Sequence, residues 1–363
     1  MDNDVVAAMI PYFSTYYTNP SNSNAVEGLE ISSQIEEARN QIATCFGADS
    51  QEIYFTSGAT ESINTIIKGI YLKYSTKGNK FITTLAEHSS VLQTFEYLKK
   101  NGAEVIYLPI NSDGLIDINT LESAIDDRTI AVCIMMANNE TGVIQDIQRI
   151  AEIVHSKNSI FFSDTTQAVG KRTMNFRNLG IDAACISAHK FHGPKGIGAM
   201  YLSRKLPRVS IVPLIHGGSQ ERSLRAGTMN VPGIMGMAKA LQIATSQIGS
   251  YDRHLIQIRT FLEEKLTDEF DAQIMGTNSP RLSNTLNVML PDINNLQLLS
   301  AIKTKFTLSL GSACTANLNK SSHVIRAMGF SESFAKHTFR ISLSKYNTID
   351  EAKLFIETLK TIL

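Results

Sequence analysis

The sequence predicts an α/β protein: a large domain built on a mostly parallel sheet, then a smaller C-terminal α+β domain. Short apolar runs alternate with segments of helical periodicity up to residue 248, which is typical of a parallel sheet covered by helices. Polar residues gather repeatedly where these apolar runs end. A strongly amphipathic segment, 251–270, then leads into a different arrangement of elements. We therefore expect two domains, spanning residues 1–248 and 249–363.

The composition excludes several classes of protein. The 363 residues suit two domains at about 150 residues each, and 34 basic residues balance 34 acidic ones. This balance argues against direct binding of nucleic acid or anionic membranes. No apolar run approaches the ~20 residues of a membrane span, and the acidic start, Met1–Asp4, lacks the layout of a signal peptide. The four cysteines show no paired spacing, which argues against disulfides or a metal site and for a cytoplasmic setting.

The large domain is expected to alternate strands and helices in order along the chain. Apolar positions spaced like Ile35, Ala38 and Ile42 indicate an amphipathic helix that stops at Gly47. A continuous apolar run such as 130–135 indicates a buried strand. Strands are predicted over 53–55, 80–84, 104–108, 130–135, 159–162, 183–186 and 199–202. Helices are predicted over 5–13, 32–46, 62–74, 91–101, 119–125, 147–156 and 231–248.

The small domain is expected to begin after the amphipathic helix 251–270. Strands are predicted over 282–288, 306–310 and 338–343, and helices over 296–303, 323–328 and 349–363. The stretch 311–317 is a loop of small residues that contains Cys314. We expect this thiol, unlike the other three cysteines, to be accessible in a mobile loop and to act as a nucleophile.

Five groups of polar residues follow strands of the predicted sheet. Each has an ordinary structural explanation, such as a helix cap or a surface charge. Ligands of such sheets, however, bind beyond the carboxyl ends of the strands, where the five groups converge. The groups are Gly58-Ala59-Thr60, His88, Asn138-Asn139, Asp164 and Ser187-Ala188-His189-Lys190.

Two of these groups indicate a specific chemistry. The amine of Lys190, in a polar turn before a glycine-rich loop, could form a Schiff base with an aldehyde cofactor such as pyridoxal phosphate (PLP). The strand, small-residue turn and helix start around Gly58 form a cradle for a phosphate, because free N–H groups and the positive helix end face the anion. The spacing there fits neither a Walker A loop nor a GxGxxG fingerprint.

Six motifs together resemble the PLP-dependent cysteine desulfurases, in the class V aminotransferase group of fold type I. The resemblance covers essentially the whole chain in order and suits the subgroup with a long, mobile cysteine loop. The motifs are Thr56-Ser57-Gly58-Ala59-Thr60-Glu61-Ser62, Glu87-His88, Asn138-Asn139-Glu140-Thr141-Gly142, Asp164-Thr165-Thr166-Gln167, Ser187-Ala188-His189-Lys190 and Gly311-Ser312-Ala313-Cys314-Thr315.

The resemblance implies a role for each residue at the cofactor ring. Lys190 would carry the cofactor as a Schiff base and later move the α-proton of the substrate. Asp164 would pair with the protonated pyridine nitrogen, which keeps the ring an electron sink. His88 would stack on the ring, and Gln167 would bond to its phenolic oxygen.

The resemblance also implies how phosphate, substrate and sulfur are handled. The phosphate would be held by Ala59, Thr60, Ser187 and His189, joined by Thr228 from the other subunit of a homodimer. Asn139, beside the cofactor, and Arg340 would bind the carboxylate of L-cysteine, for which arginine offers a bidentate fork. Cys314 would take the substrate sulfur as a persulfide, leaving L-alanine, and pass it to a sulfur-acceptor protein.

The sequence departs from the family pattern in three places. Relatives usually begin with a strand and an Ala-Thr-Thr-Pro-like turn before the helix that matches 5–13, so one strand and part of the wall of the site are expected to be missing. Ala25 stands where relatives usually have a histidine. The cysteine loop has Cys-Thr-Ala-Asn rather than Cys-Thr-Ser-Ala, which bears on the choice of acceptor.

Alternatives to the desulfurase remain open from the sequence. They are a selenocysteine lyase, another PLP lyase or an aminotransferase, and a weakened paralogue that acts as a sulfur-carrier partner. Iron–sulfur cluster assembly, tRNA thiolation and DNA phosphorothioation are all possible destinations of the sulfur. The stretches 220–222 and 138–145 resemble the phosphorothioation branch.

Overall fold

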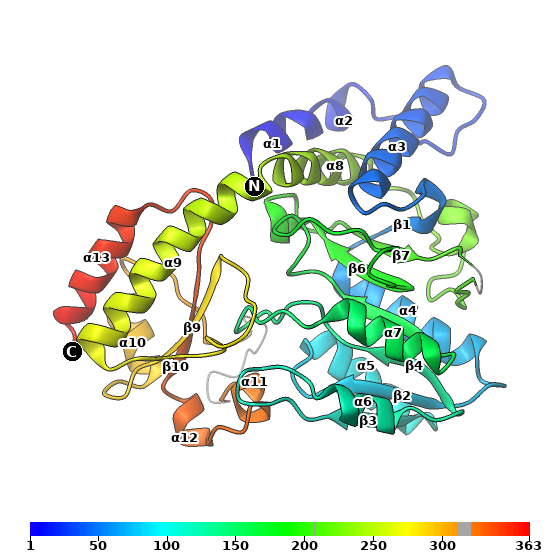
Figure 1. The fold of residues 1–363 in the computed structure, drawn as a ribbon. Helices are drawn as coiled ribbons and strands as arrows, with labels where there is room; N and C mark the ends of the chain where they lie inside the picture. The colour runs from blue at the N-terminus through cyan, green and yellow to red at the C-terminus, as the bar shows by residue number, and fades with distance from the viewer. Residues whose placement is uncertain (206–207, 311–320) are drawn as a thin grey trace.

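The computed structural model describes residues 1–205, 208–310 and 321–363, and its main feature is a seven-stranded sheet (Figure 1). The strand order is β1-β7-β6-β5-β4-β2-β3. Neighbours from β6 to β3 are parallel, whereas β7 is antiparallel to both β6 and β1. The strands are β1 (Ile53–Thr56), β2 (Lys80–Thr84), β3 (Glu104–Leu108), β4 (Thr129–Cys133), β5 (Ile160–Asp164), β6 (Ala183–Ser187) and β7 (Gly198–Leu202).

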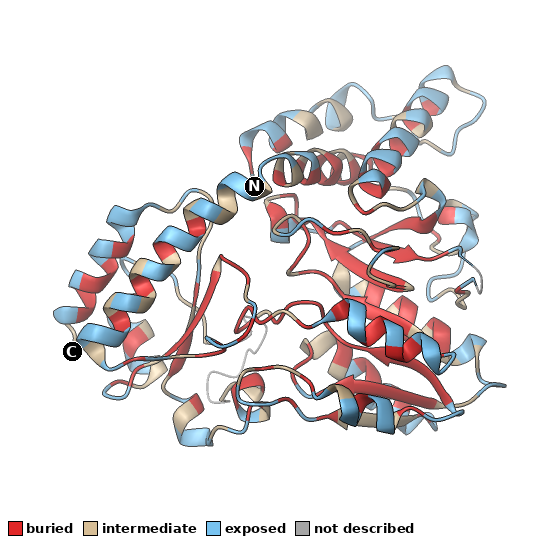
Figure 2. Cartoon of the chain, viewed as in Figure 1, coloured by how far each residue is buried: buried red, intermediate tan, exposed pale blue. Residues whose placement is uncertain are grey.

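Helices cover both faces of this sheet, so its strands are buried on each side (Figures 1 and 2). On one face lie α4 (Ala59–Lys73) and α5 (Ser89–Lys100), and on the other lie α3 (Val26–Cys45), α6 (Ile118–Ala124), α7 (Ile147–Ser156) and α8 (Val231–Ser246). Successive strand residues alternate between the faces: Phe161 joins the cluster with α3, α7 and α8, and Phe162 joins the cluster with α4 and α5. The period-2 pattern is hidden in the sequence because both faces are apolar.

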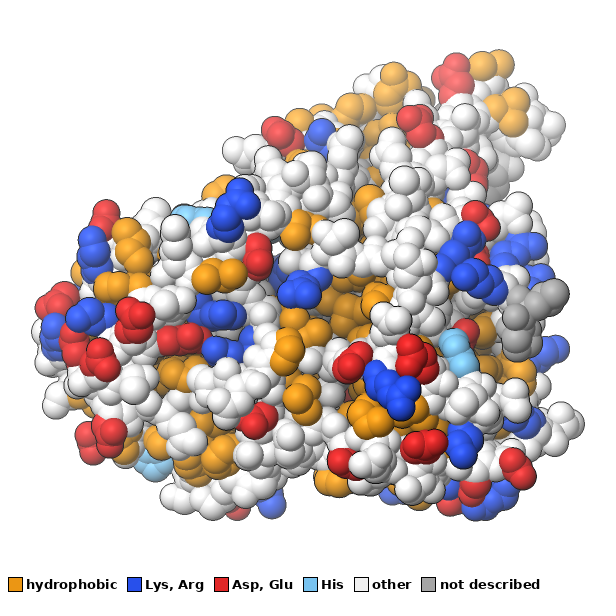
Figure 3. Space-filling view, in the orientation of Figure 1, with side chains coloured by type: hydrophobic (Ala, Val, Ile, Leu, Met, Phe, Trp, Pro, Cys, Tyr) orange, Lys and Arg blue, Asp and Glu red, His pale blue; other side chains and the backbone are white. Residues whose placement is uncertain are grey.

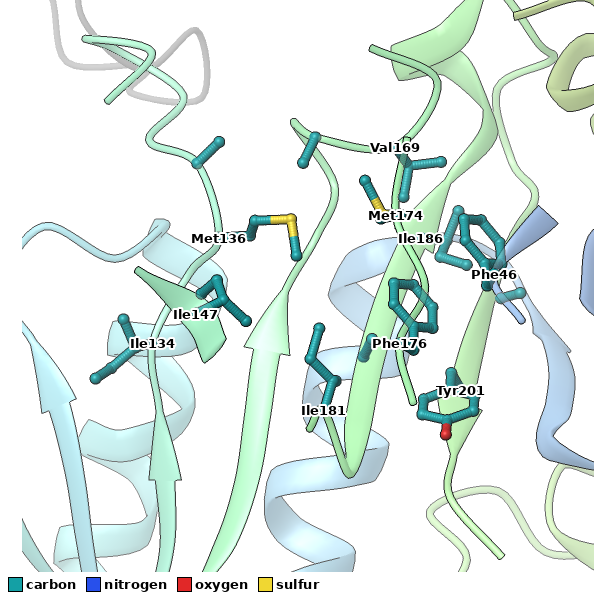
Figure 4. Packing of buried hydrophobic residues seen from close by; sticks show 14 of the residues in the cluster. Phe46, Ile134, Met136, Ile147, Val169, Met174, Phe176, Ile181, Ile186 and Tyr201 are labelled. Carbon is teal, nitrogen blue, oxygen red and sulfur yellow. The ribbon is translucent and has the colours of Figure 1, made fainter. Parts of the chain in front are cut away.

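A row of aromatic rings fixes how α3 meets the sheet (Figure 4). The rings of Phe46 and Phe176 stack with centroids 4.5 Å apart. The ring centroids of Phe176 and Tyr201 of β7 are 5.1 Å apart. The N–H of Phe176 also donates to the carbonyl of Phe46. Such pairs contribute about 0.5–1.5 kcal/mol beyond the area that they bury.

A smaller antiparallel sheet forms the other part of the molecule. Its order is β10 (Thr338–Ser342), β9 (Thr285–Met289) and β8 (Gln273–Ile274). The long helix α9 (Ile248–Phe270) runs from the main sheet to this one and packs there beside α13 (Ile349–Lys360) (Figure 1). The remaining helices here are α10 (Asn295–Ile302), α11 (His323–Ala327) and α12 (Glu332–Ala335). The apolar residues of this part form a cluster of their own.

Most of the predicted elements are present, and the differences have local causes. The helix predicted over 5–13 is divided into α1 (Asn3–Met9) and α2 (Pro11–Ser14), because Pro11 cannot continue one helix but can begin the next. The strand predicted over 306–310 is reduced to one bridge between Ser309 and Arg340. The sequence analysis missed β8 and α12, which are too short for a periodic signal.

The polar loop 216–228 is held to the main sheet by a buried ion pair. Nη1 and Nη2 of Arg39 in α3 donate to the carboxylate of Glu221, at 2.8 and 2.7 Å. The N–H of Phe55 in β1 donates to the same carboxylate at 2.5 Å. Glu221 lies in the short 3₁₀ helix η3 (Gln220–Ser223), where its φ of 46° is unusual for a residue with a side chain. In the ranges that the structure describes, no helix is long and apolar enough to span a membrane.

Candidate active site

A cavity of about 430 Å³ lies where the polar groups at the ends of the strands converge. Lys and Arg side chains gather near the junction of the two sheets on the face that Figure 3 shows. Thr228 is exposed and does not line the cavity, and Cys314 lies outside the described residues. The other ten residues predicted for the site all line the cavity: Ala59, Thr60, His88, Asn139, Asp164, Gln167, Ser187, His189, Lys190 and Arg340.

The first wall of the cavity is the beginning of α4. Gly58 precedes the helix with φ of 151°, a conformation that favours glycine. A Cβ on Gly198 of β7 would lie 2.6 Å from the Cα of Gly58, so the two backbones require glycine to approach this closely. The N–H groups of the first helical turn therefore face the cavity with the positive end of the helix dipole.

An ion pair neutralises the one acidic group in this first turn. Arg225 donates to both carboxylate oxygens of Glu61, at 2.8 and 3.3 Å, and the N–H of Ser57 donates to the same carboxylate. Burial alone would raise the pKa of Glu61, but Arg225 and Ser57 outweigh it and lower the pKa. The carboxylate is thus occupied by its own partners, and the helix end remains suited to an anion.

Lys190 lies in the 3₁₀ helix η2 (Ala188–Phe191), directly after β6. Two backbone hydrogen bonds close the turn. The N–H of Gly193 donates to the carbonyl of Ala188, and the N–H of Ala188 donates to the carbonyl of Ile197. Within it, the Ser187 hydroxyl and Nδ1 of His189 are 2.9 Å apart. Hydroxyl, imidazole and amine are therefore presented together at the edge of the sheet.

Asp164, the last residue of β5, is buried and oriented by two donors. The N–H of Thr166 donates to Oδ1 at 2.9 Å, and the thiol of Cys185 in the neighbouring β6 donates to the same oxygen at 3.2 Å. Burial, then the nearby Asp164 charge, raises the pKa of Cys185 well above its ordinary value, which keeps this thiol protonated as a donor. Both bonds use Oδ1, which leaves Oδ2 as the oxygen for a ligand in the cavity.

His88 is both the N-cap of α5 and part of the cavity wall. Its Nδ1 accepts from the N–H of Ser90 at 3.1 Å and lies 2.7 Å from the Ser90 hydroxyl, so the proton of the neutral ring is on Nε2. Burial lowers the pKa of His88, and the nearby Lys190 lowers it further against the opposing effect of Asp164. The ring is therefore uncharged near neutral pH and offers a flat face for stacking.

The turn that follows β4 joins the two sheets at the cavity. One guanidinium nitrogen of Arg340 in β10 donates to the carbonyl of Asn139 at 2.7 Å. The next residue, Glu140, is buried and accepts from the hydroxyl of Ser322, the N-cap of α11. The side-chain oxygen of Asn139 is buried, and among the described residues it has no hydrogen-bond partner. An unsatisfied acceptor in the wall of a cavity is an expected place for a ligand to donate.

Glu87, next to His88, is a fully buried carboxyl behind the cavity. It accepts from the N–H of Met135 at 2.8 Å and from the hydroxyl of Thr84. Burial raises the pKa of Glu87 to about 8, and the charge of Asp164 contributes in the same direction. Near neutral pH it is therefore protonated, so Glu87 adds no negative charge behind the cavity.

The residues of the cavity fit pyridoxal phosphate by their donor chemistry. The beginning of α4, with Ser187 and His189, suits a phosphate, and Asp164 suits a protonated pyridine nitrogen. Lys190 supplies the amine, and the flat, uncharged ring of His88 suits an aromatic ring. The unsatisfied oxygen of Asn139 is a further acceptor. Among the described residues, no group of three or more His, Cys, Asp or Glu side chains is arranged to hold a metal ion.

Several side chains that contribute to the site were not recognised from the sequence. Cys185 looks like one apolar residue in a buried run, and Arg225 is one of several basic residues in a polar loop. Glu87 is buried and Lys171 is half-buried, and no local pattern in the sequence indicates either. The only signals were the positions of two site residues: His88 directly follows Glu87, and Gln167 precedes Lys171 by four residues.

Comparison with known proteins gives one consistent result. Residues 1–355 match the model of the aminotransferase class-V family. The chain is 40% identical to the cysteine desulfurase IscS of Rickettsia prowazekii (strain Madrid E), over 97% of the chain and 85% of the relative. A solved NifS-like protein is 38% identical, with a TM-score of 0.92, over 100% of this chain and 96% of the other. The structure of SspA in complex with cysteine is 34% identical, with a TM-score of 0.83, over 96% of this chain and 97% of the other.

Proposed function

The chain belongs to the aminotransferase class-V family, as a member of its PLP-dependent cysteine desulfurases, and from this premise we propose how its residues divide the reaction. The overall reaction takes sulfur from L-cysteine and leaves L-alanine. One observation carries the proposal: Lys190, Asp164, His88 and Arg340, which are far apart in the sequence, line a single cavity.

The cofactor-holding residues each contribute a different interaction. When bound, pyridoxal phosphate supplies a ring that withdraws electrons from the bonds at the α-carbon of the substrate. Lys190 attaches the cofactor, and its Nζ later moves the α-proton. Asp164, oriented by Cys185, keeps the pyridine nitrogen protonated. Ala59, Thr60, Ser187 and His189 hold the phosphate, and Gln167 donates to the phenolic oxygen.

Substrate is recognised where the two sheets meet. Arg340 donates to the substrate carboxylate, and Asn139 lies beside it at the same end of the cavity. The bond between Arg340 and the Asn139 carbonyl holds the guanidinium at this end. A guanidinium that is already fixed loses less side-chain entropy when it binds a carboxylate.

The sulfur leaves the cavity on Cys314. We assign this role from the sequence, since the loop that contains Cys314 lies outside the described residues. The thiolate of Cys314 attacks the substrate sulfur, the carbon–sulfur bond breaks, and a persulfide forms on the enzyme while the carbon skeleton is protonated to L-alanine. A sulfur-acceptor protein then receives the persulfide sulfur.

We further propose a homodimer in which Thr228 of each subunit reaches the phosphate site of the other. Its exposure and its place outside the cavity of its own subunit are consistent with this role. A cytoplasmic location, where thiols remain reduced, suits a chain whose described cysteines Cys45, Cys133 and Cys185 are all free.

Product analysis of the cofactor-loaded protein tests the proposed function. With L-cysteine and a thiol reductant, we expect equal amounts of alanine and sulfide, and we expect Lys190→Ala to form neither. A protein that takes up no pyridoxal phosphate would overturn the assignment. Alanine formed only from selenocysteine would instead identify a selenocysteine lyase.

A further inference from the structure

Behind the cofactor cavity lies a second cavity of about 280 Å³, and Lys171 lines it. The two cavities adjoin, and the residues that line both are Asn139, Gln167, His189, Lys190 and Arg340. Lys171 lines only the second one. It is therefore placed behind Gln167, on the side away from the cofactor cavity, and has no role in the reaction proposed above.

Two hydrogen bonds connect Lys171 to Gln167. The ammonium Nζ donates to the backbone carbonyl of Gln167 at 2.8 Å and to its side-chain oxygen Oε1 at 3.0 Å. The lysine is brought back to Gln167 by a tight turn, in which the N–H groups of Lys171 and Arg172 both donate to the carbonyl of Ala168. A Cβ on Gly170 would lie 2.6 Å from Phe191, so this turn packs against the segment that carries Lys190.

The chemistry of an ammonium group fixes the orientation of the amide. A side-chain amide has an accepting oxygen and a donating nitrogen, and it can turn over to present either one. Lysine has donors and no acceptor, so only Oε1 of Gln167 can face Lys171. The amide nitrogen Nε2 must then point away from Lys171, toward the cofactor cavity.

We propose that Lys171 is a positioning residue that holds the Gln167 amide as a hydrogen-bond donor toward the phenolic oxygen of the cofactor. The inference rests on the proposed function, because it concerns how the same cavity binds its cofactor. Lys171 touches neither cofactor nor substrate in this proposal. It would act through Gln167, and its positive charge would favour the anionic form of the phenolic oxygen.

The electrostatic surroundings of Lys171 are consistent with this role. Burial lowers the pKa of Lys171 to about 7, and Lys190 and Arg340 contribute in the same direction. Its positive charge, and with it the donor-only character of the group, is therefore held only up to near-neutral pH. The other titratable and charged groups around the second cavity are Asp2, His189, His192, Tyr251, Asp252 and Lys345.

The test is a pH titration of the visible absorbance of the cofactor-loaded enzyme. Replacing Lys171 by methionine removes a donor-only partner and a positive charge, and both losses disfavour the anionic phenolic oxygen. We therefore expect Lys171→Met to raise the pH midpoint on the order of one unit. Lys171→Arg keeps a donor-only cation, so its midpoint is expected to lie close to that of the wild type. Arg172→Met, a neighbouring exposed cation without a bond to Gln167, is expected to leave the midpoint unchanged.

A double-mutant cycle separates positioning from a general charge effect. Gln167→Ala should itself raise the midpoint, and in that background Lys171→Met should add clearly less than it does alone. A wild-type midpoint in Lys171→Met, or full additivity of the two changes, would overturn the proposal while the proposed function stands. Failure of the wild-type protein to show a visible cofactor band would overturn the proposed function as well.

Discussion

One guanidinium nitrogen of Arg340 donates a 2.7 Å hydrogen bond to the backbone carbonyl of Asn139, a residue 201 positions away in the chain. The bond joins β10 of the small sheet to the turn after β4 of the main sheet. The substrate end of the cavity is therefore assembled only when the two sheets are together. Because this contact places Asn139 and Arg340 side by side, we propose that they bind one carboxylate.

Removing Arg340 should weaken substrate binding more than catalysis. Hydrogen bonds to charged groups are worth about 1.5–3 kcal/mol, so we expect Arg340→Ala to raise the KM for L-cysteine by about 10- to 150-fold. Because the carboxylate is bound equally before and during the reaction, kcat should change much less. Arg326→Ala, which removes an exposed arginine from α11, is the control. An unchanged KM in Arg340→Ala would exclude Arg340 as the carboxylate ligand.

The buried carboxyl of Glu87 should make stability fall as pH rises. Burial raises its pKa from 4.5 to about 8 in the folded protein. Below 4.5 the carboxyl is protonated in both the folded and unfolded states. Between 4.5 and 8 only the unfolded state releases the proton, so unfolding becomes more favourable by up to about 1.4 kcal/mol per pH unit. Above 8 both states are ionised and the loss is complete.

Glu87→Gln should remove this contribution while keeping the acceptor for the N–H of Met135. Urea unfolding at about pH 5 and about pH 8 measures it: relative to wild type, the variant should be more stable at the higher pH than at the lower. Glu122→Gln, at an exposed position of α6, serves as the matched control and should follow wild type. If the free energy of unfolding depends on pH in the same way for Glu87→Gln and wild type, Glu87 is ionised in the folded protein and this account is wrong.

The buried ion pair between Arg39 and Glu221 should contribute far more to stability than the exposed ion pair between Arg39 and Glu36. Only 4% and 1% of these two side chains are exposed, whereas Glu36, the second partner of Arg39, is 50% exposed. Removing one member of a buried pair leaves an uncompensated charge, so we expect Glu221→Gln to cost about 3–5 kcal/mol. Glu36→Gln should cost about 1 kcal/mol or less. Equal shifts in the denaturation midpoints of the two variants would contradict this account.

The order of strands and helices and the location of the site could be predicted from the sequence, because both leave local signals. Apolar runs mark the strands, and Asp164 and Lys190 directly follow two of them. The bond that holds Arg340 against Asn139 left no such signal, because it depends on how two sheets pack. The same is true of Cys185, whose thiol looks like an ordinary buried side chain until β6 is placed beside β5. Pro11 did carry a local signal for the break between α1 and α2.

The burial of charged residues was the feature that the sequence indicated least well. Glu221 lies in a polar stretch of sequence, and nothing nearby in that stretch indicates that Arg39 would meet it in the interior. Lys171 likewise follows a site motif without any pattern that predicts its bonds to Gln167. The buried charges of Arg39 and Glu221 stabilise one another across 182 positions of the sequence, so the structure is needed to identify the pair.

The central claim is that Lys190 activates the substrate while Cys314 takes the sulfur, and the cofactor-loaded Cys314→Ser variant tests it most directly. After addition of L-cysteine, we expect this variant to keep the visible cofactor band and to respond to substrate in its absorbance spectrum. Mass spectrometry of the intact protein should show one added sulfur atom in the wild type and none in the variant, which should also produce no sulfide. Sulfide release at the wild-type rate by Cys314→Ser would contradict the account.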